Sequence, residues 1–124
     1  MHATILLAHG SRDPSWSAPL LQVAQRMREL QPHTHVCCAY LELCPPDLGS
    51  VVEELIAQQV SQIRILPMFL GLGKHAREDL PVLVGTLRQR HPSLQIELRP
   101  SIGEDPRLIH ALAQLALDRL PACP

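Results

Sequence analysis

The sequence of 124 residues contains very few aromatic side chains, with one Trp, one Tyr and one Phe. Hydrophobic residues nevertheless make up 46% of it, so its core must be built mainly from Leu, Ile, Val and Ala. The length suits one compact domain with a real core and is too short for two ordinary domains. We therefore expect a single domain that covers residues 1–124.

Long apolar runs and a charge excess are also missing. No stretch approaches the ~20 apolar residues that a membrane-spanning helix requires, and Met1 leads into a strand-like segment without the basic and apolar regions of a signal peptide. The formal net charge of −1 gives no general attraction to nucleic acid or anionic membranes. We expect a cytoplasmic protein that binds neither membranes nor nucleic acid, and in which any anionic ligand is met by local positive charge.

The four cysteines do not form a recognisable metal or redox motif. Cys37, Cys38, Cys44 and Cys123 show no CxxC spacing. The adjacent Cys37 and Cys38 would point to opposite faces of a strand. We interpret all four as reduced thiols that fill space.

The hydrophobic pattern alternates between two periods along the chain. Short apolar or β-branched runs predict strands at residues 3–9, 35–42, 62–70 and 94–100. Between and after them, apolar residues recur every three or four positions, as on one face of a helix. The four helical stripes are Leu20, Ala24, Met27 and Leu30; Leu48, Val51, Val52, Leu55 and Ile56; Leu80, Leu83, Val84 and Leu87; and Leu108, Ile109, Leu112 and Leu115.

An acidic residue and a proline accompany the start of each predicted helix. An acidic side chain accepts hydrogen bonds from free N–H groups of the first turn, and proline fits the first helical position without losing a bond. The pairs are Asp13 with Pro14, Asp47 with Pro46, Asp79 with Pro81, and Asp105 with Pro106.

The order βαβαβαβα predicts an α/β fold, with a four-stranded parallel sheet and helices on both faces. Ligands of such sheets bind beyond the carboxyl ends of the strands. The unusual polar residues fall at these ends. His9 and Arg12 follow the first strand, Glu42 ends the second, and Lys74 and His75 follow the third in "GLGKHAREDLP", residues 71–81, which we expect to be a loop.

His9, Glu42 and His75 offer two imidazoles and a carboxylate at one edge of the sheet. Such a set suits a divalent transition metal with open coordination positions. Taken singly, each residue is equally compatible with a solvated side chain, a helix cap or a surface ion pair. "GLGKH" lacks the glycine spacing and the Ser or Thr of a Walker loop. Histidine phosphatases carry an arginine before the histidine, in the motif "RHG". In "AHGSR" this position is Ala8, which weakens the interpretation of the chain as a histidine phosphatase.

Three segments in order, "LLAHGSRDP", "AYLELCPPDL" and "LPMFLGLGKHAREDLP", resemble the short form of the CbiX family, the sirohydrochlorin cobaltochelatases of the class II chelatase superfamily. The resemblance runs over nearly the whole chain. It implies insertion of Co2+ into sirohydrochlorin in cobalamin synthesis, without ATP or an organic cofactor. Larger relatives enclose the tetrapyrrole between two such domains, so the resemblance implies a homodimer here.

The resemblance also implies roles for individual residues. His9 and His75 would be the metal-binding and catalytic pair, with either as general base, and Glu42 would be a third ligand. The substrate-binding residues would be Ser11, Arg12, Gly71, Gly73, Lys74 and Arg77, with the glycines admitting a flat ring and the cations binding its carboxylates.

Three alternatives remain open at this stage. Close relatives insert nickel or iron into the same tetrapyrrole, and imidazole and carboxylate ligands bind Co2+, Ni2+ and Fe2+ by similar chemistry. A non-catalytic carrier of metal or tetrapyrrole could use the same pocket. A hydrolase built on "AHGSR" would turn over a phosphate ester without metal.

Overall fold

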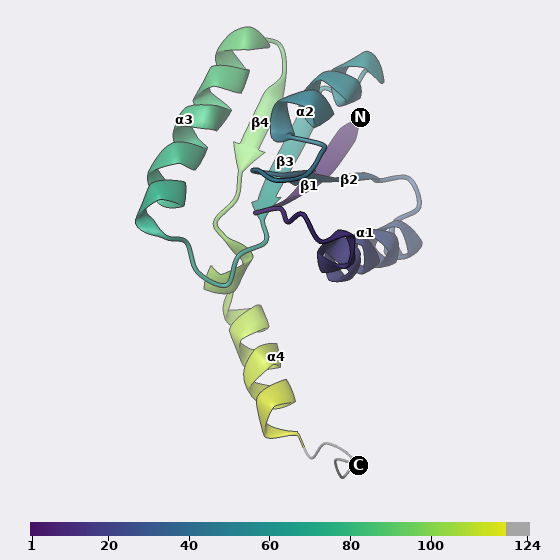
Figure 1. Ribbon diagram of the computed structural model, residues 1–124. Helices are drawn as coiled ribbons and strands as arrows, with labels where there is room; N and C mark the ends of the chain where they lie inside the picture. Colours follow the sequence, from purple (N-terminus) through teal and green to yellow (C-terminus); the bar gives the residue numbers. More distant parts are fainter. Residues whose placement is uncertain (119–124) are drawn as a thin grey trace.

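The computed structural model describes residues 1–118. At its centre lies a four-stranded parallel sheet with the strand order β2-β1-β3-β4 (Figure 1). The strands are β1 (His2–Ala8), β2 (His35–Tyr40), β3 (Gln62–Pro67) and β4 (Gln95–Leu98). Each begins within one residue of its predicted start and ends one to three residues before its predicted end. The predicted α/β class and parallel sheet are confirmed.

Four α-helices and two short 3-10 helices follow the strands. The helices are α1 (Ala18–Leu30), α2 (Leu48–Ala57), α3 (Lys74–Arg90) and α4 (Pro106–Leu117). The 3-10 helices are η1 (Pro14–Ser17), just before α1, and η2 (Ile102–Glu104), just before α4.

The central strand β1 is buried on both faces. Ile5 and Leu7 belong to a core that α2 and α3 complete, whereas Leu6 belongs to a smaller core against α1. Successive side chains of a strand point to opposite faces, so β1 requires cover on each side. Helices on both faces are thus confirmed, with α1 on one face and α2 and α3 on the other.

Helix α3 begins earlier than the sequence suggested. Pro81 was expected at its first position, but the helix starts at Lys74 and contains Pro81 in its interior. The segment 71–81 is therefore a loop only as far as Gly73, and this correction places His75 in the first turn of a helix. The sequence does not indicate this early start, because residues 74–79 are all exposed except the half-buried Ala76 and therefore form no apolar stripe.

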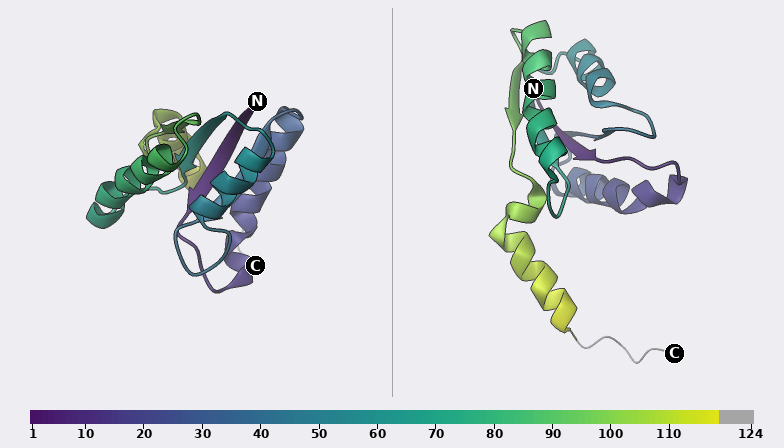
Figure 2. Two further views of the ribbon diagram at one scale, coloured as in Figure 1. Left: turned by 90° about the horizontal axis from the view of Figure 1, so that it is seen from above. Right: turned by 60° about the vertical axis from the view of Figure 1, so that its left-hand side comes forward.

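Helix α4 is present, but it does not lie on the sheet. None of its residues is buried, and the helix extends away from the rest of the molecule beyond the end of β4 (Figures 1 and 2). The stripe of Leu108, Ile109, Leu112 and Leu115 correctly predicted a helix, but the helix packs on neither face of its own sheet.

Two of the predicted acidic residues cap the N-termini of α-helices as expected. The Ser50 N–H donates to Asp47 Oδ1 at 2.8 Å at the start of α2, and the Arg107 N–H donates to Asp105 Oδ1 at 2.9 Å at the start of α4. Asp13 accepts from the Ser15 N–H at 3.0 Å and caps η1. Asp79 caps nothing because it lies within α3.

The cysteines within the described residues are free and half-buried. Cys37 packs against the core of α2 and α3, and Cys38 against the core of α1, so the pair does divide between the faces of β2. Cys123 lies outside the described residues. Among residues 1–118 there is no helix with the length and apolar character needed to cross a membrane.

We predict that Asp47→Ala lowers the free energy of unfolding at pH 7 by about 1 kcal/mol, because the first turn of α2 loses its cap. The hydrogen bonds from Ser50 hold the pKa of Asp47 below its usual value of 3.8. The stabilisation is therefore present at neutral pH and is lost as the pH falls through the lowered pKa. Urea denaturation at several pH values measures both effects. Asp79→Ala is the matched control, and an equal loss in both variants would contradict the cap.

Candidate functional site

The candidate site lies where the chain leaves the two middle strands in opposite directions. After β1 the chain turns to α1 on one face of the sheet, and after the neighbouring β3 it turns to α3 on the other face. Parallel sheets open a crevice at such a point, beyond the carboxyl ends of the strands. His9 follows β1 directly, and the segment 69–75 connects β3 to α3.

Backbone hydrogen bonds extend the pairing of β1 and β2 into the site. The Leu41 N–H donates to the Ala8 carbonyl and the Glu42 N–H donates to the His9 carbonyl, both at 2.9 Å. Gly10 adopts a φ of +103°, and a Cβ placed there would lie 1.8 Å from the Glu42 carbonyl oxygen. Glycine is therefore required at position 10, and the backbones that carry His9 and Glu42 are held together.

The His9 imidazole rests against Phe69, with the ring centroids 4.3 Å apart and the planes at 49°. Phe69 is itself buried. Its carbonyl accepts hydrogen bonds from the Ser101 hydroxyl and, at 2.9 Å, from the Gly103 N–H. His9 is exposed, so one side of the ring is supported while the side chain stays accessible.

Three residues that support His9 were not predicted from the sequence: Gly10, Phe69 and Gly103. A Cβ at Gly103 would lie 1.9 Å from the Leu70 carbonyl oxygen, so this glycine is required as well. The single Phe of the chain, placed just after a predicted strand, was the available signal. Nothing in the sequence shows that its ring meets His9, because the contact joins segments 60 residues apart.

His75 lies in the first turn of α3 and is exposed. The N-cap residue, Gly73, has an extended backbone and offers no side chain to the free N–H groups of this turn. The positive end of the helix dipole therefore remains open to an anion. Lys74 and Arg77, with Glu78, line a hollow of about 410 Å³ beside it, so the structure brings together two of the predicted substrate-binding cations.

Gly71 and Gly73 differ from Gly10 and Gly103. A Cβ at either would meet nothing within 4 Å, and neither has a positive φ. No contact among the described residues therefore requires glycine at these two positions, which border the start of α3.

Ser11 and Arg12 follow His9 in the segment that connects β1 to η1. The Ser11 hydroxyl accepts from the Asp13 N–H at 3.1 Å, which helps shape the turn into η1. Arg12 is exposed and forms none of the ion pairs found within residues 1–118. Its guanidinium is therefore available to a ligand.

The part of the chain that the structure describes does not assemble a three-ligand metal site. Among residues 1–118, no three His, Cys, Asp or Glu side chains lie close enough together to hold a metal ion. His9, Glu42 and His75 share the edge of the sheet, but they do not form a preformed cage.

The fold and the edge site together define an α/β protein that presents two exposed histidines at the switch point of a four-stranded parallel sheet. The CbiX family model matches residues 3–119. The chain belongs to the CbiX family.

Individual relatives agree with this assignment. A sirohydrochlorin cobaltochelatase of Methanocaldococcus jannaschii is 31% identical over 73% of this chain, which spans 64% of the length of that relative. A sirohydrochlorin ferrochelatase of Priestia megaterium is 27% identical over 92% of the chain and 43% of its own length. The chain thus spans less than two thirds of the first protein and under half of the second.

Two solved structures share the fold. A CbiX protein of Marinobacter aquaeolei VT8 assigned to cobalamin biosynthesis is 34% identical, with a TM-score of 0.83 over 94% of each chain. The sirohydrochlorin chelatase SirB of Bacillus subtilis subspecies spizizenii, solved with cobalt, gives a TM-score of 0.71 at 24% identity. That match covers 91% of this chain and 48% of SirB.

We predict that Gly10→Ala destabilises the fold by about 1–3 kcal/mol, because the added methyl strains the positive φ and collides with the Glu42 carbonyl. Thermal or urea unfolding measures the loss. Gly49→Ala, in α2 with no atom closer than 3.9 Å to the new Cβ, is the control and should be neutral or stabilising by up to about 1 kcal/mol. Similar stability of the two variants would refute the close approach at Gly10.

Proposed function

We propose that this protein inserts Co2+ into sirohydrochlorin without ATP, as a step in tetrapyrrole metallation for cobalamin synthesis. The observation that carries the proposal is the pair of exposed imidazoles, His9 and His75, at the switch point of the sheet in a member of the CbiX family. The names of several relatives, which are sirohydrochlorin cobaltochelatases, support it.

The chemistry requires a site that binds metal and then releases it. A divalent ion must lose water, reach the centre of the macrocycle and replace two pyrrolic N–H protons. A closed four-ligand site would retain the ion. Two imidazoles capture Co2+ and leave its other positions open to water and then to pyrrole nitrogens. The absence of a preformed group of three ligands among the described residues suits this transfer, with Glu42 as an occasional ligand from the neighbouring loop.

Each proton released from the macrocycle needs an acceptor. An imidazole that gives up the metal becomes free to accept a proton, so His9 and His75 can each act as ligand and then as general base. Phe69 restricts one side of the His9 ring and so fixes the direction from which this imidazole meets the metal and the macrocycle.

The periphery of sirohydrochlorin carries many carboxylates. Lys74 and Arg77, the open N-terminus of α3, and the exposed Arg12 after β1 provide positive charge for them. Gly71 and Gly73 carry no side chains before the start of α3, and the space around each is open, with nothing within 4 Å of the place a Cβ would take. Ser11, in the turn before η1, completes the substrate-binding set of the proposal.

Cobalt is the proposed metal because most of the named relatives are cobaltochelatases. Iron and nickel are the alternatives. One relative is named a ferrochelatase, and solved structures of SirB hold cobalt in one case and Fe3+ in another. Parallel insertion assays with Co2+, Fe2+ and Ni2+ rank the three metals.

The proposal includes a homodimer. One chain provides an open edge, whereas a macrocycle must lose water on both of its faces to be desolvated. A second edge placed opposite the first would enclose it, as a two-fold dimer allows.

We predict that His75→Ala lowers the initial rate of metal insertion by at least about 100-fold, because it removes a metal ligand and a proton acceptor. His9→Ala should act alike, and Glu42→Gln should cost about tenfold or less. The absorbance change of sirohydrochlorin on metallation gives the rate, and circular dichroism reports the fold. Both histidines are exposed, so their alanine variants should remain folded.

His33→Ala is the control, since His33 is exposed between α1 and β2, away from the site, and should keep the full rate. A folded His75→Ala variant with an undiminished rate would remove this residue from the mechanism. Wild-type protein that binds Co2+ and ring but does not exceed the spontaneous rate would be a carrier and not a chelatase.

A further inference from the structure

Two leucines beside the candidate site are exposed to water. Leu43 is 52% exposed and Leu70 is 70% exposed, and neither belongs to the two cores of the molecule. Single exposed leucines are ordinary on a protein surface. These two differ because the chain holds both in place next to His9, and because the backbone at Leu43 is strained.

Leu43 lies at the centre of a strained turn. Its φ is 70°, in the left-handed region that leucine rarely adopts. The Cys44 N–H donates to the Glu42 carbonyl at 2.9 Å and closes a three-residue turn around Leu43. A γ-turn with positive φ is rare and strained, and strain of this kind gathers at functional sites. Core packing does not explain a leucine here, since half of its side chain is in water.

Close backbone contacts fix the positions of both leucines. The Glu42 carbonyl, which begins the turn at Leu43, packs on Gly10 so closely that no Cβ fits there. The Leu70 carbonyl packs in the same way on Gly103. Each exposed leucine is therefore presented by a backbone segment that a required glycine holds.

The two leucines follow residues that contact His9 from opposite sides. The Glu42 N–H donates to the His9 carbonyl from the side of β2, and the Phe69 ring contacts the His9 imidazole from the side of β3. Leu43 and Leu70 are the next residues along the chain. Neighbouring strands lie about 4.8 Å apart, so the segments on the two sides of His9 are separated by about 10 Å, which is the scale of a four-pyrrole macrocycle.

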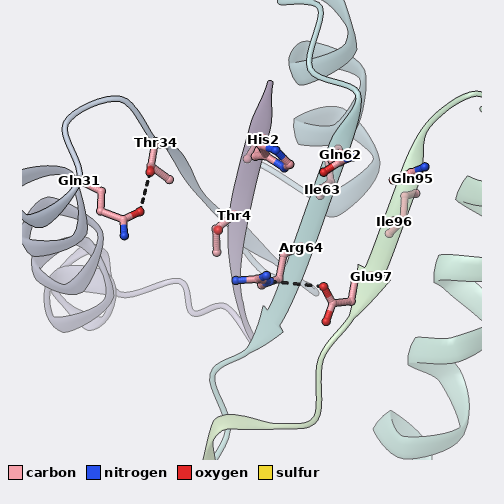
Figure 3. Close-up of a pocket in the computed structure, with 11 residues that line it drawn as sticks. His2, Thr4, Gln31, Thr34, Gln62, Ile63, Arg64, Gln95, Ile96 and Glu97 are labelled. Carbon is pink, nitrogen blue, oxygen red and sulfur yellow. Dashed lines mark hydrogen bonds and ion pairs between the residues drawn. The ribbon is translucent and has the colours of Figure 1, made fainter.

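The groove nearer the amino ends of the strands has a different character. Figure 3 looks onto this groove of about 410 Å³, whose lining includes the first residues of β1, β3 and β4. Most of its side chains are polar, and the Arg64 guanidinium there pairs with Glu97 at 3.4 Å. The apolar face of a ring gains little from displacing water from such a lining. The exposed leucines at the carboxyl ends of the strands suit it better.

We propose that Leu43 and Leu70 form an apolar platform for one face of the tetrapyrrole, with His9 between them. The proposal rests on the proposed function, because it concerns how that site holds its substrate. A conjugated macrocycle is apolar on its faces and charged at its rim, so the two parts need different contacts. The leucines remove water from one face, while cations such as Arg12 and Lys74 bind the carboxylates of the rim. A ring held by its face turns its central nitrogens towards a metal on the His9 imidazole.

The strain at Leu43 predicts opposite effects on stability and on binding. Asparagine adopts positive φ more readily than leucine, but its amide group is hydrated and does not replace the apolar contact. Leu43→Asn should therefore leave the fold at least as stable as the wild type and at the same time weaken binding of the ring. A leucine with a purely structural role would not separate these two effects.

The test is a titration of the protein with sirohydrochlorin in the absence of metal, followed by the absorbance of the ring. Leu43→Asn and Leu70→Asn should each raise the Kd about tenfold, as expected when the exposed part of a leucine side chain loses its apolar contact. Leu43→Met and Leu70→Met keep an apolar side chain and should stay within about twofold of the wild type. Urea denaturation of the same variants measures their stability.

Leu30→Asn is the matched control. Leu30 is 73% exposed at the end of α1, which leads into the start of β2, so this variant should bind the ring as the wild type does. Co2+ titrated without the ring should bind all of these variants with unchanged affinity, because the imidazoles of the site remain.

An unchanged Kd for the ring in either Asn variant of the platform would overturn it, and so would Met variants as weak as the Asn variants. An equal loss in Leu30→Asn would indicate non-specific adsorption of the ring and would also overturn it. A Leu43→Asn variant that loses stability or Co2+ affinity together with ring binding would assign Leu43 a structural role instead.

Metal insertion is measured separately with the same proteins. Wild-type protein that shows the expected binding pattern but does not exceed the spontaneous rate of insertion refutes the proposed function alone. Wild-type protein that inserts metal, with ring binding that does not respond to substitution of Leu43 and Leu70, refutes the platform alone.

Discussion

Burial of β1 on both faces is the constraint on which the rest of the structure depends. Ile5, Leu6 and Leu7 are completely buried in the middle of the sheet, and consecutive residues of a strand can be buried only if both faces are covered. Helices must therefore lie on both sides, and the connections after β1 and β3 must diverge. His9 lies at this point of divergence, directly after β1, so the position of the site is a consequence of how the core is packed.

Much of this arrangement could be predicted from the sequence because its signals are local. Alternating hydrophobic periods gave the order of strands and helices, and the acidic residues Asp47 and Asp105 marked true helix starts. The parallel sheet then placed His9 and His75 at one edge. Helix α3 was misjudged because its first turns carry exposed polar residues, which leave no hydrophobic period, and because Pro81 is tolerated inside the helix.

The remainder of the site depends on contacts between distant segments. Phe69 supports His9 across 60 residues of sequence, and Gly10 is required by the Glu42 carbonyl, which belongs to another loop. No local pattern encodes such pairs. Prediction from an amphipathic stripe is limited in a related way. The stripe indicates that one face of a helix is buried, but it does not indicate which surface buries it. Ile109 and Leu112 of α4 have the spacing that is typical of a buried helix face, yet both are exposed in the single chain.

The exposure of the two histidines is physically tied to the proposed transfer chemistry. A metal ion held by buried, fully paired ligands is difficult to release, and a flat macrocycle cannot reach it. In this protein the site is supported by hydrogen bonds: the backbone pairing of His9 with Glu42, and the bonds that the Ser101 hydroxyl and the Gly103 N–H donate to the Phe69 carbonyl. Ser101 and Gly103 belong to the segment that leads directly into α4. The contacts that support the His9 imidazole therefore also hold the segment between β4 and α4, so the site and the start of the last helix depend on the same hydrogen bonds.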